Sequence, residues 1–505
     1  MSRDAKRRLC FWAIFALGLA ARLWRFGAVP EGINQDEAFA GYEAFCLLRD
    51  GMDTAGYRFP VYLTAWGSGM NALESYLMLP FVALFGLKTW VVRLPQLLVG
   101  LLSLPAARGI ARRLRDETQA LVTMLLLAIC PWHVLLSRWG LESNLAPGFL
   151  LFGLYFFLRG VEDSRFFWLA GLCYGLSLYA YATIWPFVPL MLALSLLYCA
   201  RHHKLRFDRN LLGGGLLLFL LAAPLLLFLA VNYGLMEELR TPFFSVPKLL
   251  VLRAGEFSLR HIPENLKNLF TILWTQSDGL PWNYAEGYGL LYPLSAPFAL
   301  LGLLSLVERR RKRPGFDPMA LVLFQLLAGL LLGALVSVNV NRVNLIFPPL
   351  VFLTAEGLCW FGARFRSRPL PLLLAAYLVC FGFFVRSYFT DYSARLRASF
   401  AWGLEEALDA AQTQDKTVVL SGDVYYPDVL FYTAYEPAVF RESVKYQVYP
   451  AAYLRAASFD GYRFGWEGET EADAVYLLSP WTKGDALNEA GFESQRYGYY
   501  TLYWK

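Results

Sequence analysis

Long apolar blocks recur along this 505-residue chain and set the first limit on its fold. Each block runs for about 17 to 22 residues, the length that an α-helix needs to cross a hydrocarbon core of about 30 Å. A closed β-barrel would instead alternate apolar and polar residues one by one. Because 57% of the residues are hydrophobic and only 17% are charged, ordinary soluble domains are excluded. The sequence therefore predicts an all-α polytopic membrane domain.

Basic residues cluster at the ends of these blocks and set the expected topology. Positive charge is favoured on the cytoplasmic side of a membrane helix, so each basic cluster is placed inside. The net charge of +6 is explained by this loop asymmetry, and nucleic acid is not expected as a partner. The first block follows a basic N-terminus and is interpreted as a retained signal-anchor. The clusters are Arg3 to Arg8, Arg108 to Arg115, Arg201 to Arg206, Arg309 to Arg313 and Arg364 to Arg368.

Alternation between inside and outside then predicts about eleven spans, with the N-terminus cytoplasmic and the C-terminus extracytoplasmic. A further apolar run, residues 73–87, is short, contains Pro80 and carries Glu74 near its start, so it is predicted to be an interfacial or re-entrant helix. Two long extracytoplasmic loops are expected at residues 27–90 and 232–289. The predicted spans are residues 10–26, 91–110, 120–136, 146–158, 167–181, 186–198, 211–231, 290–306, 320–336, 345–360 and 372–384.

The composition changes after Arg386, where the apolar blocks stop and short β-like runs appear among charged residues. Residues 417–420, 474–478 and 497–504 are predicted to be strands, and residues 428–435 a helix. We therefore expect a transmembrane domain over residues 1–390 and a small extracytoplasmic α/β domain over residues 391–505. The seven cysteines show neither a disulfide framework nor zinc spacing, and no nucleotide-binding glycine motif is present.

An acidic pair, Asp36-Glu37, lies in the first extracytoplasmic loop. Asn34 and Glu37 have the spacing of a capping box, so a structural explanation competes with a catalytic one. Neighbouring residues on a helix point in different directions, so the two carboxylates are not expected to act on one substrate atom. We expect Asp36 to carry the chemistry, while Glu37 serves equally well as a capping residue.

Several arginines on the same predicted side of the membrane are candidates for binding a phosphate. Their forked, permanently charged groups suit phosphate oxygens, although each is also explained as an interfacial arginine. Arg342 stands out because it lies in a polar turn, residues 339–344, between two apolar blocks. The candidates for the phosphate are Arg342, Arg138, Arg93 and Arg58, and those for contacts with acceptor or sugar are Glu142, Asn144, Tyr181 and Trp282. Tyr181 is also explained as a membrane-interface anchor, and Glu142 as a helical partner of Arg138.

The order of several short strings along the chain resembles the polytopic GT-C glycosyltransferases of the protein O-mannosyltransferase and lipid A aminoarabinose transferase kind. The resemblance covers most of the membrane portion. The strings are Asp36-Glu37-Ala38, Val92-Arg93-Leu94-Pro95, Arg112-Arg113-Leu114, Cys130-Pro131-Trp132-His133, Ser137-Arg138, Leu178-Tyr179-Ala180-Tyr181, Asn341-Arg342-Val343-Asn344 and Phe347-Pro348-Pro349.

This resemblance implies inverting transfer of a hexosyl or pentosyl group from a polyprenyl-phosphate or dolichyl-phosphate donor to a protein, lipid or polysaccharide outside the cytoplasm. It implies that Asp36 is the general base and that Arg342, first among the arginines, stabilises the departing phosphate. A divalent metal ion is a further candidate for that work. Two departures leave the metal open: Ala182 follows Tyr181 where some relatives have histidine, and Glu142 stands where aspartate is common.

Two other classes of function stay open from the sequence. A carrier or flippase for lipid-linked sugars would place its charges in broken, repeated helices at mid-membrane depth, whereas here they gather at one face. A polysaccharide polymerase or ligase would also need extracytoplasmic arginines. The acidic first loop and the C-terminal domain favour the transferase, with membrane lipids and a lipid-linked donor as partners. The bacterial plasma membrane is the expected location.

Overall fold

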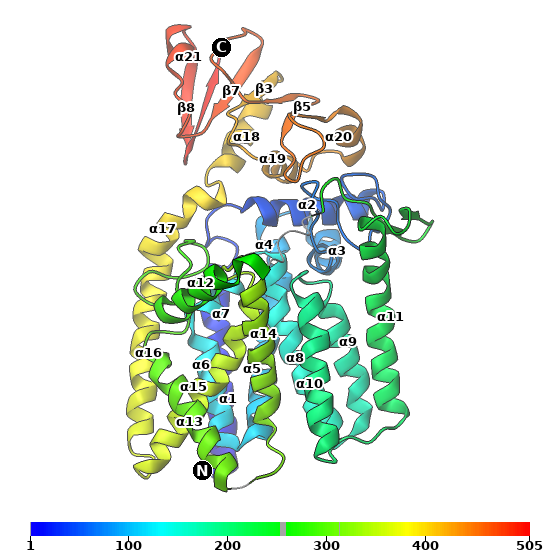
Figure 1. The fold of residues 1–505 in the computed structure, drawn as a ribbon. Helices are drawn as coiled ribbons and strands as arrows, with labels where there is room; N and C mark the ends of the chain where they lie inside the picture. The colour runs from blue at the N-terminus through cyan, green and yellow to red at the C-terminus, as the bar shows by residue number, and fades with distance from the viewer. Residues whose placement is uncertain (1, 253–258, 313) are drawn as a thin grey trace. The chain divides into compact units, whose positions relative to one another are not determined.

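The computed structural model describes residues 2–252, 259–312 and 314–505 and is mostly helical (Figure 1). The chain divides into two compact units, which are considered separately. The first unit comprises Met1–Phe26, Gln96–Ala223 and Ala254–Tyr392. The second comprises Gly27–Pro95, Pro224–Arg253 and Ser393–Lys505.

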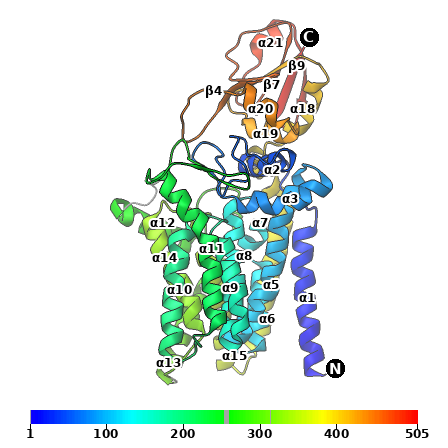
Figure 2. The ribbon, with the colours of Figure 1, turned by 90° about the vertical axis from the view of Figure 1, so that its right-hand side faces the viewer.

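Most helices of the first unit are apolar and run side by side in two perpendicular views, and α12 lies across the end of this bundle (Figures 1 and 2). Close approach is possible where glycine replaces a side chain: α13 and α15 meet so tightly that a Cβ at Gly302 or Gly357 would collide with the backbone of the other helix. The helices are α1 (Arg3–Leu23), α5 (Leu94–Leu114), α6 (Glu117–Ile129), α7 (Pro131–Leu136), α8 (Glu142–Glu162), α9 (Phe167–Ser177), α10 (Ile184–Arg201), α11 (Arg209–Asn232), α12 (Ile262–Thr275), α13 (Ser295–Lys312), α14 (Met319–Leu335), α15 (Phe347–Arg364) and α16 (Pro369–Ser387).

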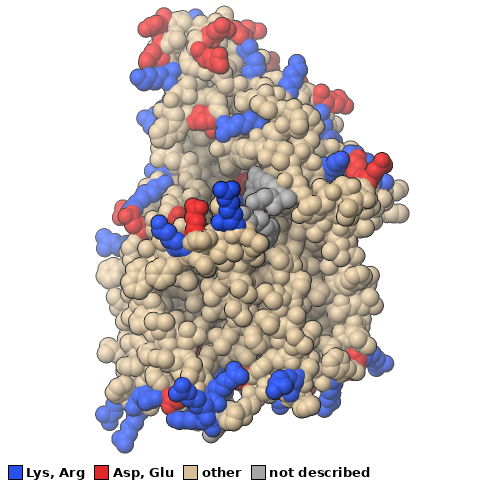
Figure 3. All heavy atoms as spheres, in the orientation of Figure 1, with Lys and Arg blue, Asp and Glu red and all other residues tan. Residues whose placement is uncertain are grey.

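Within the described residues, six helices are long and apolar enough to cross a membrane. They are Thr89–Leu114, Glu142–Glu162, Ile184–Arg201, Arg209–Asn232, Asn344–Arg364 and Pro369–Phe400. Every predicted span coincides at least in part with a helix, but the count of about eleven spans stays a prediction. Basic side chains gather at one end of the first unit (Figure 3), where α13 ends in Arg309, Arg310, Arg311 and Lys312.

The second unit combines the first predicted loop with the C-terminal part of the chain. Its α3 has 13 residues, and at a rise of 1.5 Å per residue it is about 20 Å long, short of a span. The helices of this unit are α2 (Gln35–Arg49), α3 (Leu73–Phe85), α4 (Thr89–Val92), α17 (Ser393–Leu396), α18 (Leu404–Gln412), α19 (Tyr426–Tyr432), α20 (Pro437–Ser443) and α21 (Asp485–Glu489). Two short strands, β1 (Leu239–Arg240) and β2 (Ser245–Val246), pair antiparallel.

The C-terminal residues form a seven-stranded mixed sheet in the order β4-β5-β6-β3-β7-β9-β8. The central strand β3 pairs parallel with both β6 and β7, and the remaining pairs are antiparallel. All five residues of β7 are buried, as expected for a central strand. The strands are β3 (Thr417–Leu420), β4 (Lys445–Tyr446), β5 (Ala456–Phe459), β6 (Tyr462–Phe464), β7 (Ala474–Leu478), β8 (Glu493–Tyr497) and β9 (Tyr500–Trp504). The predicted α/β character is confirmed.

One hydrophobic core joins residues of α2 and α3 with residues of α18, α19 and the sheet. The Trp66 ring stacks on the Tyr453 ring with centroids 4.4 Å apart, and the Tyr42 hydroxyl donates to the Tyr435 carbonyl at 2.8 Å. Residues 393–505 therefore fold together with residues 27–95, whereas the sequence assigned these two stretches to different domains.

Candidate active site

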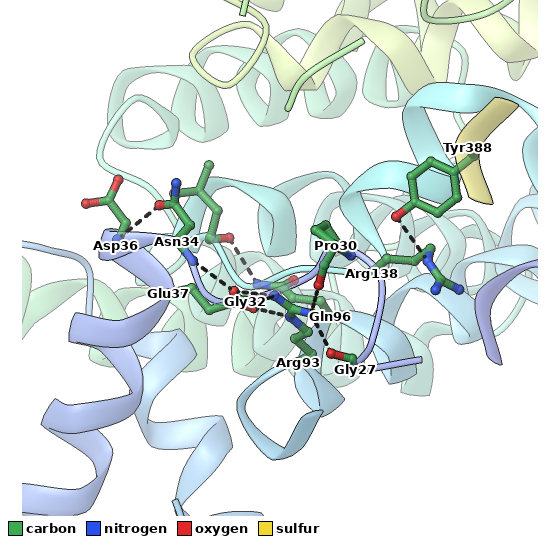
Figure 4. Close-up of polar contacts among 11 residues, drawn as sticks. Gly27, Pro30, Gly32, Asn34, Asp36, Glu37, Arg93, Gln96, Arg138 and Tyr388 are labelled. Carbon is green, nitrogen blue, oxygen red and sulfur yellow. Dashed lines mark hydrogen bonds and ion pairs between the residues drawn. The ribbon is translucent and has the colours of Figure 1, made fainter. Parts of the chain in front are cut away.

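The acidic pair begins helix α2 in the second unit. Asn34 is the N-cap: its side-chain oxygen accepts from the Asp36 backbone N–H at 3.1 Å, and its own N–H donates to Glu37 Oε2 at 3.4 Å. The capping box expected from the spacing is thus present. Asp36 and Glu37 then leave the helix in different directions (Figure 4).

Glu37 forms a fully buried ion pair with Arg93, which lies between α4 and α5. Arg93 Nε donates to Glu37 Oε1 at 2.7 Å and Nη2 donates to Oε2 at 2.9 Å. The other N–H groups of Arg93 donate to the carbonyls of Gly27 at 3.1 Å, Pro30 at 2.9 Å and Gly32 at 2.7 Å. A guanidinium has five N–H donors, so all of them are in use. Glu37 and Arg93 together hold residues 27–34 in place.

Arg138, in the first unit, is also buried and binds backbone carbonyls. It is fully buried, and its Nε donates to the Tyr388 hydroxyl at 3.1 Å (Figure 4). Its Nη1 and Nη2 donate to four carbonyls at the end of α1, those of Ala21, Arg22, Trp24 and Arg25. A cation is favourable there because the helix dipole is negative at its C-terminus. In this conformation a phosphate contact by Arg93 or Arg138 would require giving up a hydrogen bond to the backbone.

Asp36 is in a different position from its neighbour. It is partly exposed, whereas Glu37 is fully buried. Its side chain points away from the cluster of Glu37 and Arg93 (Figure 4). The N-terminus of α2 favours the ionised carboxylate. Asp36 is thus the more accessible carboxylate of the pair.

The remaining predicted residues lie in two places. Arg58, in the second unit, is exposed and lies 5.9 Å from the centre of the Phe59 ring. In the first unit, Arg342 is half-buried and its Nη1 donates to the Ser337 carbonyl at 3.1 Å. Glu142, at the start of α8, and Tyr181 are also half-buried.

A small cavity in the first unit is lined by polar and aromatic side chains, including Asn144 and Trp282, two of the residues predicted to contact acceptor or sugar. The centre of a water molecule can occupy about 10 Å³ of this cavity. The cavity therefore has room for about one water molecule. Asn144 Nδ2 is buried and has no hydrogen-bond partner among the described residues. The other lining residues are Trp132, Leu135, Leu136, Trp139, Asn283, Val340, Asn341 and Asn344.

Several of these lining residues were not among the predicted contacts. Trp132 Nε1 donates to Asn344 Oδ1 at 2.7 Å, and Asn344 Nδ2 donates to the Ser143 carbonyl at 3.3 Å. In the sequence, Asn341 and Asn344 are indicated by the polar turn at residues 339–344, where asparagine repeats between apolar blocks. Asn341 lines the cavity and directly precedes Arg342 in the chain.

Within residues 2–252, 259–312 and 314–505, no group of three or more His, Cys, Asp or Glu side chains could hold a metal ion. The divalent metal ion considered from the sequence stays a prediction.

The comparisons with known proteins agree with this fold. The family described as dolichyl-phosphate-mannose-protein mannosyltransferase matches residues 73–228. ArnT from Cupriavidus metallidurans in the apo state has a TM-score of 0.59 at 14% identity, covering 99% of this chain and 98% of that one. The same protein bound to undecaprenyl phosphate gives 0.59 at 13% identity, with the same coverage. No curated protein sequence matches the chain.

A third similar structure is the archaeal oligosaccharyltransferase AglB from Archaeoglobus fulgidus in complex with an inhibitory peptide and a dolichol-phosphate. Its TM-score is 0.50 at 14% identity, and the match covers 86% of this chain and 61% of AglB. Together the family match and the two folds confirm the predicted resemblance to the GT-C glycosyltransferases. They also confirm the fold class, a mostly helical multi-pass membrane protein with a C-terminal α/β part.

Proposed function

We propose that this chain is a glycosyltransferase that moves a hexosyl or pentosyl group from a polyprenyl-phosphate or dolichyl-phosphate donor to a hydroxyl of a protein, lipid or polysaccharide. The observation that carries the proposal is the separation of the acidic pair. Glu37 is buried against Arg93, while the neighbouring Asp36 is partly exposed at the start of the same helix. Support comes from the mannosyltransferase family match, from an ArnT structure bound to undecaprenyl phosphate, and from AglB in complex with a dolichol-phosphate.

The proposed reaction is a direct displacement at the anomeric carbon. Asp36 takes the proton of the acceptor hydroxyl as its oxygen attacks that carbon. The bond from the anomeric carbon to the phosphate oxygen breaks, and the lipid phosphate leaves with the electron pair. A single displacement inverts the anomeric configuration. Arg342, half-buried in the polar turn before α15, stabilises the charge that develops on the phosphate.

The buried ion pair serves this reaction by fixing the base. Arg93 binds Glu37 on α2 and three carbonyls in the segment before it, so the backbone that carries Asp36 is fixed at several points. A catalytic carboxylate benefits from such support because small displacements of the reacting groups reduce the rate strongly.

We place the reaction outside the cytoplasm of a bacterial plasma membrane, with the N-terminus inside and the C-terminal domain outside. The gathering of Lys and Arg at one end of the first unit supports this orientation, because basic helix ends favour the cytoplasmic side (Figure 3).

Replacement of Asp36 by Asn tests the proposal. The purified protein is given a radiolabelled polyprenyl-phosphate sugar together with a threonine-containing peptide, lipid A or an oligosaccharide. We expect transfer by Asp36→Asn to fall by about 10²–10⁴-fold, the usual contribution of a general base, with the fold intact. Asp460→Asn is the matched control, because Asp460 is an exposed acid of the same unit. Full transfer by Asp36→Asn, or movement of the labelled lipid across vesicles without transfer, would exclude the mechanism.

A further inference from the structure

Helix α19 of the C-terminal domain runs beside α2, and the contacts follow the same order along both helices. A Cβ added at Gly41 of α2 would lie 2.9 Å from Cε2 of Phe431 on α19. Nearer the start of both helices, the Phe39 and Tyr426 ring centroids lie 5.7 Å apart. Beyond the end of α19, the Tyr42 hydroxyl donates to the Tyr435 carbonyl at 2.8 Å. The labels of α2 and α19 are adjacent in both ribbon views (Figures 1 and 2). The start of α19, with Asp428, therefore lies toward the end of α2 that carries Asp36.

Asp428 is a buried acid without a compensating partner. Its exposed fraction is 3%, and its Oδ1 has no hydrogen-bond partner among the described residues. Burial raises the pKa of Asp428 well above its usual value, and the charge of Asp36 raises it further. Burial therefore favours the neutral form of this carboxyl group, and a neutral carboxyl can both donate and accept a hydrogen bond.

A second polar group in the same surroundings also lacks a partner. The Tyr453 hydroxyl is buried without a hydrogen bond to any described residue. Burial raises the pKa of Tyr453, with smaller contributions from Tyr425, Asp36 and Asp428. Polar atoms buried without partners are unfavourable, and two of them near one catalytic candidate indicate a place that a ligand completes.

Other titratable groups surround Asp428 on several elements. Their pKa values respond to its charge, which places them in its electrostatic range. The charge of Asp428 raises the pKa values of Tyr432 on α19, Tyr453 before β5 and Tyr500 on β9. The pKa of Asp428 is in turn raised by the charge of Asp36 on α2.

We infer that the C-terminal domain supplies part of the acceptor site, in which the buried Asp428 carboxyl group and the Tyr453 hydroxyl bind a hydroxyl-bearing acceptor and hold it beside Asp36. This inference rests on the proposed function. The proton still passes from the acceptor hydroxyl to Asp36, and Asp428 keeps its own. Asp428 is thus a residue that binds and orients the acceptor, and the lipid-linked donor does not depend on it.

A spectroscopic experiment tests the site without any substrate. The carbonyl stretch of neutral carboxyl groups is followed by infrared spectroscopy across pH in the full-length protein, and the part lost in Asp428→Asn is assigned to Asp428. We expect Asp36→Asn to lower the midpoint of that band, because a neighbouring negative charge has been removed. Glu43, another buried acid of α2, is the control, and its band should not move. An unchanged Asp428 midpoint, or an Asp428 midpoint at the usual value of an exposed aspartate, would overturn the inference.

A kinetic experiment tests the role in binding. Asp428→Leu keeps the branched shape of the side chain but removes its polar atoms, so it leaves no buried charge. Asp428→Asn keeps a neutral hydrogen-bonding group. With the peptide, lipid A or oligosaccharide that becomes labelled, we expect Asp428→Leu to raise the acceptor KM at least tenfold without changing the donor KM. Asp428→Asn should stay within about threefold of the native chain, as expected for exchange of one neutral hydrogen-bonding group for another.

Two results of the kinetic experiment would contradict the inference: an unchanged acceptor KM in Asp428→Leu, or equal changes in both KM values. If none of the three acceptors is labelled by the native chain, the proposed function fails. The infrared midpoint then still decides whether Asp428 and Asp36 are coupled.

Discussion

Replacing Glu37 by Gln should unfold the second unit more readily, although the substitution changes few atoms. Arg93 would keep its charge in a site that is fully buried, with its ionic partner gone. Removing one partner of a buried ion pair costs about 3–5 kcal/mol, because the remaining charge is uncompensated. The carbonyls of Gly27, Pro30 and Gly32 would still accept from Arg93, so the upper part of this range is not expected.

The effect is measured as the apparent unfolding temperature of the purified protein, followed by tryptophan fluorescence. A domain of 150–250 residues loses roughly 2–4 °C for each kcal/mol. A loss of about 3–4 kcal/mol should therefore lower the transition of Glu37→Gln by about 6–16 °C. Heating of a membrane protein is often irreversible, so all variants are heated at one rate. Asp36→Asn is the matched control, since it changes the adjacent acid, which points away from the ion pair (Figure 4).

Asp36→Asn should unfold within about 2 °C of the native chain while losing transfer, because its role is chemical and its carboxylate is partly exposed. Below its transition temperature, Glu37→Gln should lose less transfer per folded molecule than Asp36→Asn, because it loosens the support of the base but leaves the base in place. If Glu37→Gln were as stable as the native chain and yet inactive, the assignment of a structural role to Glu37 and a chemical one to Asp36 would be refuted.

Two further outcomes follow from buried polar groups. Burial first, and then the charge of Asp53, raises the pKa of Glu43 to about 8 from 4.5. The folded chain therefore binds more protons than the unfolded chain between these values, and its stability falls as pH rises from about 4.5 to about 8. Glu43→Gln cannot ionise, so denaturation from pH 5 to pH 8 should show it gaining stability relative to the native chain, and parallel curves would contradict this. Asn144→Ala should leave the unfolding temperature unchanged and raise the donor KM about two- to tenfold, the effect expected from losing one hydrogen bond. An unchanged donor KM would show that Asn144 does not contact the sugar.

The parts of the fold that follow local rules could be predicted from the sequence. The capping box at Asn34 depends on residues three positions apart, and β3 and β7 are short buried runs of branched and aromatic residues. Strands β5 and β6 were not predicted, because they are short and half-polar and are fixed by pairing with each other and with β3. The shared core of residues 27–95 and 393–505 was also missed, since contacts across more than 300 positions leave no periodic signal.

Asp428 could not be predicted as a site residue from the sequence. It lies in a helical run of aromatic and apolar residues, Tyr426–Tyr432, where a single aspartate resembles a solvent-facing residue. Only the packing of α19 on α2 reveals that the side chain is buried and lacks a partner at Oδ1. The sequence could identify Asp36 by its position after the first apolar block, but not the second acid brought to it by a distant domain.

The contacts of the two buried arginines, Arg93 and Arg138, make them weaker candidates for binding the donor phosphate. The forked charge made all four arginines candidates from the sequence, and the polar turn at residues 339–344 put Arg342 first. The four are Arg58, Arg93, Arg138 and Arg342. In the structure Arg93 and Arg138 each use all five N–H groups within the protein, and they hold consecutive stretches of chain, residues 27–32 and 21–25. A phosphate would have to compete with these contacts in a buried site, whereas the exposed Arg58 and the half-buried Arg342 can be reached. Of those two, Arg342 lies in the turn that also supplies Asn341 and Asn344 to the polar cavity, so the donor phosphate is best sought beside that turn.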